Sequence, residues 1–387
     1  MFSSGIKFIN FTTKNKLQET KIRKYLIKIL NQPNNIIQSL SKNYKYSFNS
    51  KKIISKYKKF FNCRIIGMGG SSLGAQAIYT FLKHKIKKNF MFIDNLNAIN
   101  KNYKQSNFLN IVVSKSGNTL ETILNSSFYI KKKDKNIFIT EKNNNFLLKL
   151  ANQLKAEIID HNNYIGGRYS VLSEVGMLPA EIMGLNSKKF KQLNNLIKDK
   201  IFLKSLVSNV ASTLYFIKKK KLNSVIINYD ENSENLFKWY QQLIAESLGK
   251  KSKGLLPIIS NMPKDNHSVM QLYLDGPKNN FFSFFFVNKP ISNRIYVNKI
   301  HSEFEYLKNK NFNEILLSQK KATENIFTKK KIPFRSFEVF KKDEKIMGEL
   351  FTFFILETIL LGKALDINPY DQPSVELIKT ETKRILV

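Results

Sequence analysis

Asn110–Glu121 reads NIVVSKSGNTLE and contains the strongest structural signal in the chain. The β-branched run Ile111–Val113 stops at a polar turn, and a helix-like pattern follows. Between a buried parallel strand and a helix N-terminus, backbone N–H groups and the helix dipole favour an anion. The hydroxyls of Ser114, Ser116 and Thr119 can each donate to a phosphate oxygen. The pattern also fits a turn in which Ser and Thr act only as N-caps, so both interpretations stay open at this point.

A second strand-to-helix junction lies upstream. The apolar residues Cys63–Ile66 precede Gly67–Gly74, which reads GMGGSSLG, and a helical pattern over Ala75–Leu82 follows. A P-loop would have Lys after the last glycine, where this chain has Ala75. A dinucleotide fingerprint begins with Gly-x-Gly, as here, but the next acidic residue, Asp94, lies too far along. Dinucleotide binding is therefore the weaker interpretation.

The wider pattern indicates an α/β protein. Short apolar runs alternate with helical patterns, which is typical of βαβ units and a parallel sheet. In the first half the expected strands are Cys63–Ile66, Phe90–Ile93, Leu109–Val113, Asn136–Ile139 and Ala156–Ile159. Residues 170–220 look helical. A second alternating region, Leu222–Val339, has expected strands near Ser224–Asn228, Phe281–Val287 and Phe334–Val339.

We expect two doubly wound parallel-sheet domains, each an α-β-α sandwich, with helical segments at both ends of the chain. The expected domains are 59–185, with the phosphate-binding loops, and 186–342. A mostly helical segment, 1–58, would precede them, and a helical arm, 343–387, would return to the active site. No short-period repeat is visible in the sequence.

Composition limits the classes of function. The 387-residue chain has a formal net charge of +35, but only six of its 64 basic residues are arginine and the lysines are spread along the whole sequence. Because base readout favours arginine, we expect no specific nucleic-acid partner, although the positive field would attract an anionic small substrate.

The single cysteine, Cys63, is expected to be a small buried group. The longest apolar stretch, Leu350–Leu361, is too short to span a bilayer and the N-terminus lacks a signal-peptide pattern, so we expect a cytoplasmic protein.

Two segments offer residues for chemistry. Arg168 directly follows two glycines, where its guanidinium could stabilise a developing oxyanion or, alternatively, pair a buried carboxylate. A predicted helix over Trp239–Gly249, ended by its glycine, places Gln242 and Glu246 on one face. Partial desolvation would raise the pKa of Glu246 toward that of a general base, whereas a solvated surface glutamate is the simpler alternative.

Two further residues are weak candidates on spacing alone. His267 lies in DNHSVMQ, at a predicted helix start capped by Asp265 or Asn266, and a histidine in a capped turn is usually structural. Lys379 follows Pro373, a predicted helix start, by about two turns and reads as a solvated cation. No histidine shows metal-ligand spacing, so we expect no metal or other cofactor.

Taken in order, these segments resemble the phosphoglucose isomerase family, which is built on the sugar-isomerase (SIS) fold. The resemblance covers about 65–385 and rests on six motifs: GMGGSSLG, SKSGNTLET, GGRYSVLSEVG, QQLIAESLGK, DNHSVMQ and DQPSVELIK. It implies that one group of residues holds the substrate phosphate. These are Gly70, Ser71, Ser114, Lys115, Ser116, Thr119 and Gln372, with Gly70 and Lys115 acting through the backbone.

The resemblance also implies catalytic roles. Glu246 matches the family's base, Arg168 its intermediate-stabilising arginine, His267 and Lys379 its ring-opening pair, and Gln242 a substrate contact. The implied reaction interconverts glucose 6-phosphate and fructose 6-phosphate by ring opening and a cis-enediolate, in glycolysis and gluconeogenesis. It would occur in a homodimer in which His267 crosses the interface. Alternatives are a bifunctional glucose/mannose phosphate isomerase, an amino-sugar phosphate isomerase and a non-catalytic sugar-phosphate-binding regulator, although no helix-turn-helix pattern supports the last.

Overall fold

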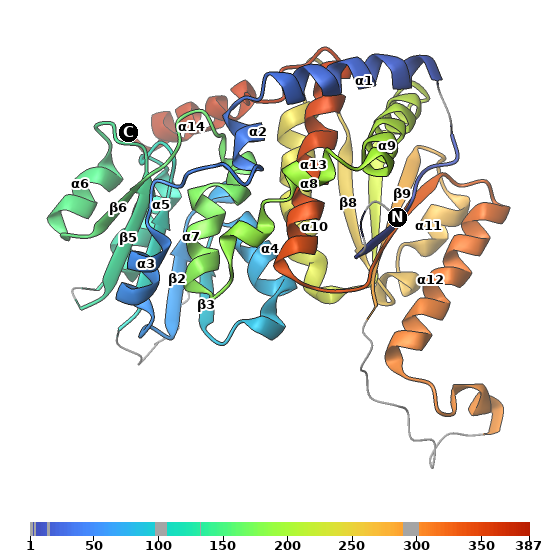
Figure 1. Cartoon of the computed structure of the whole chain (residues 1–387), viewed down its shortest axis with the longest axis horizontal. Helices are drawn as coiled ribbons and strands as arrows, with labels where there is room; N and C mark the ends of the chain where they lie inside the picture. The colour runs from blue at the N-terminus through green and yellow to red at the C-terminus, as the bar shows by residue number, and fades with distance from the viewer. Residues whose placement is uncertain (1–2, 4, 14–15, 97–106, 132, 289–301) are drawn as a thin grey trace.

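The computed structural model describes residues 3, 5–13, 16–96, 107–131, 133–288 and 302–387. Its strands form two five-stranded sheets with helices packed around and between them (Figure 1). In the first sheet all strands are parallel, in the order β3-β2-β4-β5-β6. Its members are β2 (Asn62–Ile66), β3 (Asn89–Ile93), β4 (Leu109–Val113), β5 (Lys135–Thr140) and β6 (Glu157–Asp160).

The second sheet has the order β1-β10-β9-β7-β8. Four of its strands are parallel, and β1 pairs with β10 in the antiparallel sense, with Ile6 opposite Val339. Its members are β1 (Ile6–Ile9), β7 (Asn223–Asn228), β8 (Leu256–Asn261), β9 (Asn280–Val287) and β10 (Phe334–Val339). The predicted α/β class with two mainly parallel sheets is confirmed.

The two sheets repeat one topology that the sequence does not reveal. The spatial order β3-β2-β4-β5 in the first sheet corresponds to β8-β7-β9-β10 in the second. In both sheets the strand that comes second along the chain lies at the edge, followed by the first, third and fourth. The fifth place is filled by β6 in one sheet and by the antiparallel β1 in the other. In such sheets ligands bind beyond the carboxyl ends of the strands, where the strand order reverses. In the first sheet this point lies between β2 and β4.

Two strands differ from the sequence-based expectation. The sequence predicts a mostly helical N-terminal segment, but Ile6–Ile9 forms β1; this short strand is defined by its long-range pairing with β10 and not by a local pattern. The sequence pattern does not predict β8, because the second residue of this strand is Pro257. Proline is tolerated there because β8 is an edge strand, where a missing N–H removes no ladder bond.

Helices connect the strands and cover the sheets. The α-helices are α1 (Lys16–Asn31), α2 (Asn35–Ser39), α3 (Ser50–Tyr57), α4 (Leu73–Phe81), α5 (Leu120–Tyr129), α6 (Phe146–Gln153), α7 (Glu174–Ile182), α8 (Leu193–Leu196), α9 (Lys200–Lys218), α10 (Glu234–Leu248), α11 (Met270–Asp275), α12 (Phe312–Lys329), α13 (Glu344–Ala364) and α14 (Pro373–Leu386). The 3₁₀ turns are η1 (Gly69–Ser71), η2 (Lys83–Lys85), η3 (Gly167–Leu172), η4 (Ser187–Phe190), η5 (Glu231–Ser233), η6 (Lys264–His267) and η7 (Ser302–Leu307).

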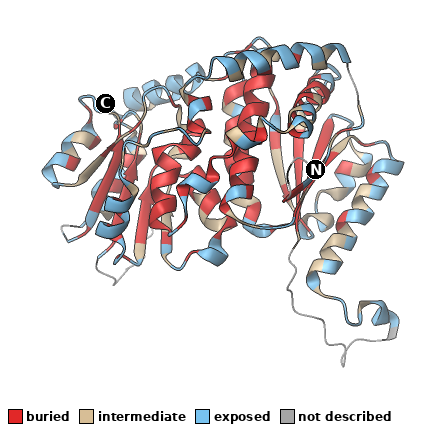
Figure 2. Ribbon diagram, viewed as in Figure 1, coloured by how far each residue is buried: buried red, intermediate tan, exposed pale blue. Residues whose placement is uncertain are grey.

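The core lies between the two sheets, where helices pack against both. Helices α10 and α13 run through the centre of the molecule, and nearly every residue of α13 is buried (Figure 2). Trp239 of α10 packs edge-on against Phe351 of α13, with ring centroids 4.7 Å apart. Helix α4, which follows β2, packs on α10 and so joins the first sheet to this centre. In the described part of the chain, α13 included, no helix combines the length and apolar character that a membrane crossing requires.

Candidate active site

The turn after β4 brings two of the predicted phosphate-binding hydroxyls together. The Oγ of Ser114 lies 2.9 Å from the Oγ1 of Thr119, the N-cap residue of α5. The Thr119 side chain makes no capping hydrogen bond, so N-capping does not explain its presence. The exposed Ser116 accepts a bond from the backbone N–H of Asn118 at 3.3 Å. Gly117 has a φ of +65°, and a Cβ there would lie 1.9 Å from Asn145 Oδ1, so the tight turn requires glycine.

The side chain of Lys115 points away from this turn. Its Nζ donates to the carbonyl of Asn163 at 2.6 Å and lies 3.6 Å from the Glu141 carboxylate. Its own carbonyl accepts from the backbone N–H of Glu141 at 3.1 Å. The backbone of Lys115 is therefore the part that lies in the turn, while its ammonium joins the loops after β5 and β6.

The glycine loop after β2 lies between the Ser114 turn and Arg168. A Cβ on Gly67 would lie 2.8 Å from the Val113 carbonyl oxygen and 3.0 Å from the Cβ of Ser71, so Ser71 is beside the end of β4. A Cβ on Gly70 would lie 2.2 Å from the carbonyl carbon of Gly167 and 2.5 Å from the nitrogen of Arg168. This close approach of η1 and η3 is possible only because both loops are glycine-rich.

Arg168 is the centre of the site. The side chain is 1% exposed, and each of the five N–H donors of its guanidinium has an acceptor within the chain. The acceptors are Ser247 Oγ for Nε (2.8 Å), Glu246 Oε2 (3.1 Å) and Gln372 Oε1 for Nη1, and the carbonyls of Pro369 (2.9 Å) and Asp371 (3.0 Å) for Nη2. The sequence predicts Arg168 and Gln372 as site residues, and the structure brings them into contact.

Glu246 lies on α10 between two hydrogen-bond donors. Its Oε1 accepts from Gln242 Nε2 at 2.8 Å, and its Oε2 accepts from Arg168. The predicted helix with both residues on one face, ended by Gly249, is confirmed. The Glu246 side chain is 26% exposed, so it is not the buried carboxylate of a purely structural ion pair. The buried Oε1 of Gln242 has no hydrogen-bond partner in the described structure, and its amide nitrogen lies against Gly69.

Sequence reasoning missed two residues that contact this site. Ser247 accepts the Nε–H bond of Arg168, and its Oγ lies 2.9 Å from the hydroxyl of Tyr169. The Tyr169 hydroxyl donates to the Pro369 carbonyl at 3.0 Å. Both residues directly follow a predicted catalytic residue, and this adjacency was the available signal. A Ser or Tyr beside a charged residue is too common to single out without the three-dimensional network.

His267 does not lie near Glu246 of the same chain. Glu246 is at the C-terminal end of α10, which precedes the amino end of β8, whereas His267 follows the carboxyl end of β8. The six residues of β8 alone span roughly 20 Å. His267 is exposed and ends the turn η6. The expectation that it starts a helix is wrong, because Asp265 accepts from the N–H of Asn261 and α11 begins only at Met270.

Lys379 also lies apart from Glu246. It sits on α14, none of whose residues is buried (Figure 2). Its Nζ donates to Glu376 Oε1 at 2.6 Å. Lys379 lies seven positions after Gln372, or roughly 10 Å along a helix. The structure therefore joins the start of the C-terminal arm to Arg168 and leaves Lys379 on the exposed helix.

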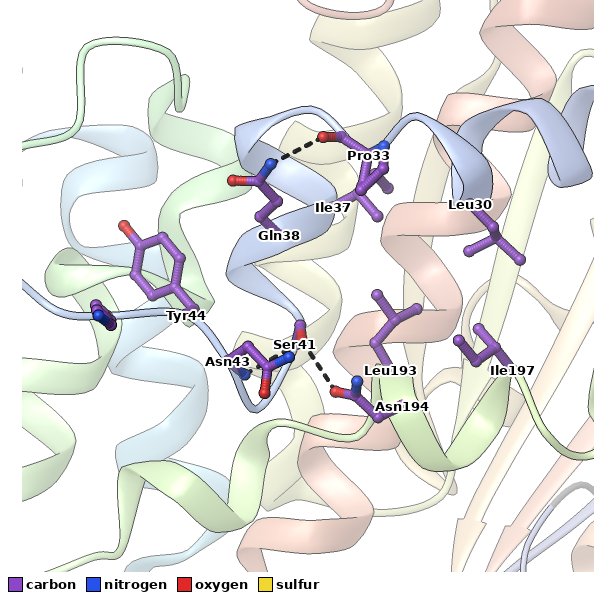
Figure 3. A pocket seen from close by; sticks show the side chains of 11 residues that line it. Leu30, Pro33, Ile37, Gln38, Ser41, Asn43, Tyr44, Leu193, Asn194 and Ile197 are labelled. Atoms are coloured by element: carbon purple, nitrogen blue, oxygen red, sulfur yellow. Dashed lines mark hydrogen bonds between the residues drawn. The ribbon is translucent and has the colours of Figure 1, made fainter.

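A separate hollow of about 490 Å³ lies between the end of α1, α2 and α8 and includes none of the predicted site residues (Figure 3). Its wall is held by a bond from Ser41 Oγ to Asn194 Oδ1 at 3.0 Å and by one from Gln38 Nε2 to the Pro33 carbonyl. Both bonds join groups of the wall to one another. The hollow lies outside the candidate site.

Two buried titratable groups, Cys63 and His161, lie outside the contacts of Arg168 and Glu246 described above. Cys63 is 1% exposed, as expected, and burial raises the pKa of its thiol to about 12. Burial also lowers the pKa of His161, at the end of β6, to about 4. Among the residues that the structure describes, no cluster of His, Cys, Asp and Glu could hold a metal ion.

Comparison with known proteins adds independent information. The family model described as phosphoglucose isomerase matches residues 31–262. The chain is 33% identical over 354 residues to a curated glucose-6-phosphate isomerase of Methanocaldococcus jannaschii, covering 84% of both proteins. It is 32% identical over 348 residues to the glucose-6-phosphate isomerase of Campylobacter jejuni, covering 84% of this chain and 85% of that protein.

Solved structures with the same fold include a hypothetical protein from Thermus thermophilus, with a TM-score of 0.85 and 20% identity over 96% of this chain and 95% of the other. A glucose-6-phosphate isomerase from Chlamydia trachomatis has a TM-score of 0.71 and 18% identity, covering 95% of this chain and 78% of the other. At these identities the likeness concerns the fold alone.

Proposed function

This chain belongs to the phosphoglucose isomerase family, and we propose how its residues interconvert glucose 6-phosphate and fructose 6-phosphate. The enzyme is an aldose–ketose isomerase. The residue assignment rests chiefly on one observation, the 3.1 Å contact between the partly exposed Glu246 carboxylate and the guanidinium of Arg168. A non-catalytic sugar-phosphate-binding regulator would have no need of this pair.

The substrate phosphate binds at the turn before α5. Ser114 and Thr119 direct their hydroxyls toward each other there, and the N-terminus of α5 adds backbone N–H groups and a favourable dipole. Ser71 lies beside this turn through the packing of Gly67 against Val113. Ser116, the backbone of Gly70 and Lys115, and the amide of Gln372 complete the proposed phosphate contacts.

Isomerisation itself uses Glu246 and Arg168. The Glu246 carboxylate removes the proton from C2 of the open-chain sugar and returns it to C1 through a cis-enediolate. The cation of Arg168 stabilises the negative charge that develops on the substrate oxygens. Gln242 orients the carboxylate through its 2.8 Å bond, and a small rotation of its side chain would turn the buried, unpaired Oε1 toward a sugar hydroxyl.

Ring opening is assigned to His267 and Lys379, which move a proton from a sugar hydroxyl to the ring oxygen. Because His267 lies beyond the far end of β8 from Glu246, the proposal places the partner subunit's His267 in each site of a two-fold dimer. Lys379 would have to leave Glu376 and approach the site through a shift of α14. The exposure of α14 is compatible with such a shift.

The proposed domain boundaries, 59–185 and 186–342, each enclose one four-strand unit of the repeated topology. The proposed N-terminal segment, 1–58, adds β1 to the second sheet, and the arm 343–387 passes through the core before reaching Arg168. A cytoplasmic location is part of the same proposal.

Replacing the base tests this assignment. We expect Glu246→Gln to lower kcat by roughly 10²–10⁴-fold, because an amide keeps the shape but cannot accept the C2 proton. Glu234→Gln removes the same charge from the first turn of α10 and should retain activity. Exchange of solvent deuterium into fructose 6-phosphate should stop together with turnover. A near-normal kcat in Glu246→Gln would refute the role of Glu246 as the base. Parallel assays of the wild type with mannose 6-phosphate and glucosamine 6-phosphate would test whether it also isomerises these sugars.

A further inference from the structure

A chain of three hydrogen bonds lies behind the guanidinium of Arg168 and has no part in the chemistry described above. Arg168 Nε donates to Ser247 Oγ at 2.8 Å, Ser247 Oγ lies 2.9 Å from the hydroxyl of Tyr169, and Tyr169 donates to the Pro369 carbonyl at 3.0 Å. The side chains of Ser247 and Tyr169 are 0% exposed. Water therefore does not reach this chain, and each member relies on its neighbours.

The protons in this chain can be placed in only one way. The Tyr169 hydroxyl has one proton, which it gives to the Pro369 carbonyl. At the contact between the two hydroxyls Ser247 must then be the donor, while its lone pair accepts from Arg168. All three bonds therefore run in one direction, from the guanidinium to the carbonyl. Such a chain fixes the plane of the guanidinium from its Nε side.

We propose that Ser247 and Tyr169 are positioning residues for Arg168. They hold the guanidinium so that its Nη1 faces Glu246 and the position of the substrate oxygens. Donors that stabilise a developing oxyanion are effective because they are oriented before the reaction begins. A loss of this orientation should therefore affect the transition state more than substrate binding. The inference rests on the proposed role of Arg168, so its test must also examine that role.

The chain contains a matched control. Arg335 Nε donates to Ser283 Oγ at the same distance, 2.8 Å, and Arg335 is 2% exposed in an ion pair with Glu357. Ser283→Ala thus removes the same kind of bond from a buried arginine that lies outside the candidate site. Ser247→Ala and Ser283→Ala should lower the melting temperature to a similar extent, because each leaves a buried N–H without its acceptor.

The activities should differ. For Ser247→Ala we expect kcat to fall roughly tenfold to hundredfold, with KM for fructose 6-phosphate within about twofold of the wild-type value. Tyr169→Phe keeps the acceptor of Arg168 but removes the last link, so its kcat should fall by roughly threefold to tenfold. Ser283→Ala should keep wild-type kcat. Tyr169→Phe also provides the test if Ser247→Ala fails to fold.

Two outcomes distinguish the positioning role of Ser247 and Tyr169 from the catalytic role of Arg168. If Arg168→Gln loses most of its kcat while Ser247→Ala and Tyr169→Phe match Ser283→Ala, the positioning role is wrong and the role of Arg168 stands. If Arg168→Gln retains its kcat, the proposed role of Arg168 is wrong and the positioning role falls with it. A rise in KM without a change in kcat would also overturn the inference, because it would show an effect on binding alone.

Discussion

The loop contact between Gly70 and the pair Gly167 and Arg168 leaves no space for a side chain. A Cβ at Gly70 would lie 2.2 Å from a backbone carbon, which real structures do not tolerate without a shift. We expect Gly70→Ala to push η1 away from η3, to lower stability by about 1–3 kcal/mol and to lower kcat/KM because Arg168 moves. Enzyme assays and thermal unfolding measure both effects.

The control for this substitution lies in the neighbouring motif. At Gly166 the nearest atom to a new Cβ would be the Tyr370 carbonyl oxygen at 3.9 Å, and the φ of −66° suits any residue. Gly166→Ala should therefore behave like the wild type. Comparable losses in Gly70→Ala and Gly166→Ala would show that the substitution acts through general flexibility and not through the close contact.

His161 should make stability depend on pH. Burial lowers its folded-state pKa to about 4 from the usual 6.5, so between these values the unfolded chain binds the proton more readily. The stabilising effect of the neutral, buried ring is complete above pH 6.5 and is lost as the pH falls toward 4, a change of about 3 kcal/mol. Urea unfolding at pH 7 and pH 5 should show a smaller difference for His161→Asn than for the wild type. An equal change in unfolding free energy between the two pH values in both proteins would show that His161 does not cause the pH dependence.

Single residues were predictable where a local motif fixes their surroundings. Arg168, Gln242 and Glu246 could be identified because a glycine pair or helical spacing presents them to the site. The mutual bond of Ser114 and Thr119 likewise follows from one short turn. The carbonyl groups of the C-terminal arm that hold Arg168 could not be predicted in this way, because they come from some 200 positions further along the chain.

Helix α14 has no buried residue, unlike the other α-helices in the described part of the chain. This exposure allows its lysines to be tested without loss of the fold. We expect Lys379→Ala to lower kcat with glucose 6-phosphate by roughly tenfold or more if it assists ring opening, and to leave the melting temperature unchanged. Lys383→Ala, one turn further on, should change neither quantity. Steady-state kinetics and thermal unfolding of both variants test this expectation. If Lys379→Ala and Lys383→Ala have the same kcat, Lys379 takes no part in the mechanism.

The strands show which elements a sequence can reveal. Long β-branched runs such as Ile111–Val113 are fully buried between helices and have a clear local signal. By contrast, β1 exists because Ile6 and its neighbours pair with β10, more than 300 positions away. Strand β8 has a proline that only its edge position makes acceptable. The information that defines these two strands is therefore not local.

The two sheets share a topology but differ in charge in the loops after their corresponding strands β2 and β7. After β2 the chain presents glycines and Ser71, whereas after β7 it places the buried Asp230, which forms an ion pair with Lys342. A carboxylate at this position disfavours an anionic ligand, and the lysine beside it is already engaged. The repeated architecture is therefore expected to bind one phosphate and not two.

The proposed dimer can be tested by mixing inactive variants. If the partner subunit's His267 completes each site, Glu246→Gln and His267→Ala co-refolded in equal amounts should regain activity. In each mixed dimer one site has both defects and the other has neither, so random pairing restores about a quarter of the sites. Native mass spectrometry verifies that mixed dimers form. Mixed dimers without activity would place His267 in the site of its own chain or outside the chemistry.

The fully bonded state of Arg168 helps the enzyme to discriminate between substrate and transition state. With all five donors in use, a sugar oxygen can approach the guanidinium only by competing with a group already there, and the neutral amide of Gln372 is the weaker competitor beside the Glu246 carboxylate. Exchanging one neutral oxygen for another yields little affinity. Exchanging the neutral Gln372 oxygen for a negatively charged enediolate oxygen yields much more binding free energy. The arginine therefore stabilises the transition state more than the bound substrate. The phosphate of a bound sugar would attract the Gln372 amide away from Arg168 Nη1. This position beside the guanidinium would therefore become free only when a phosphorylated sugar has bound.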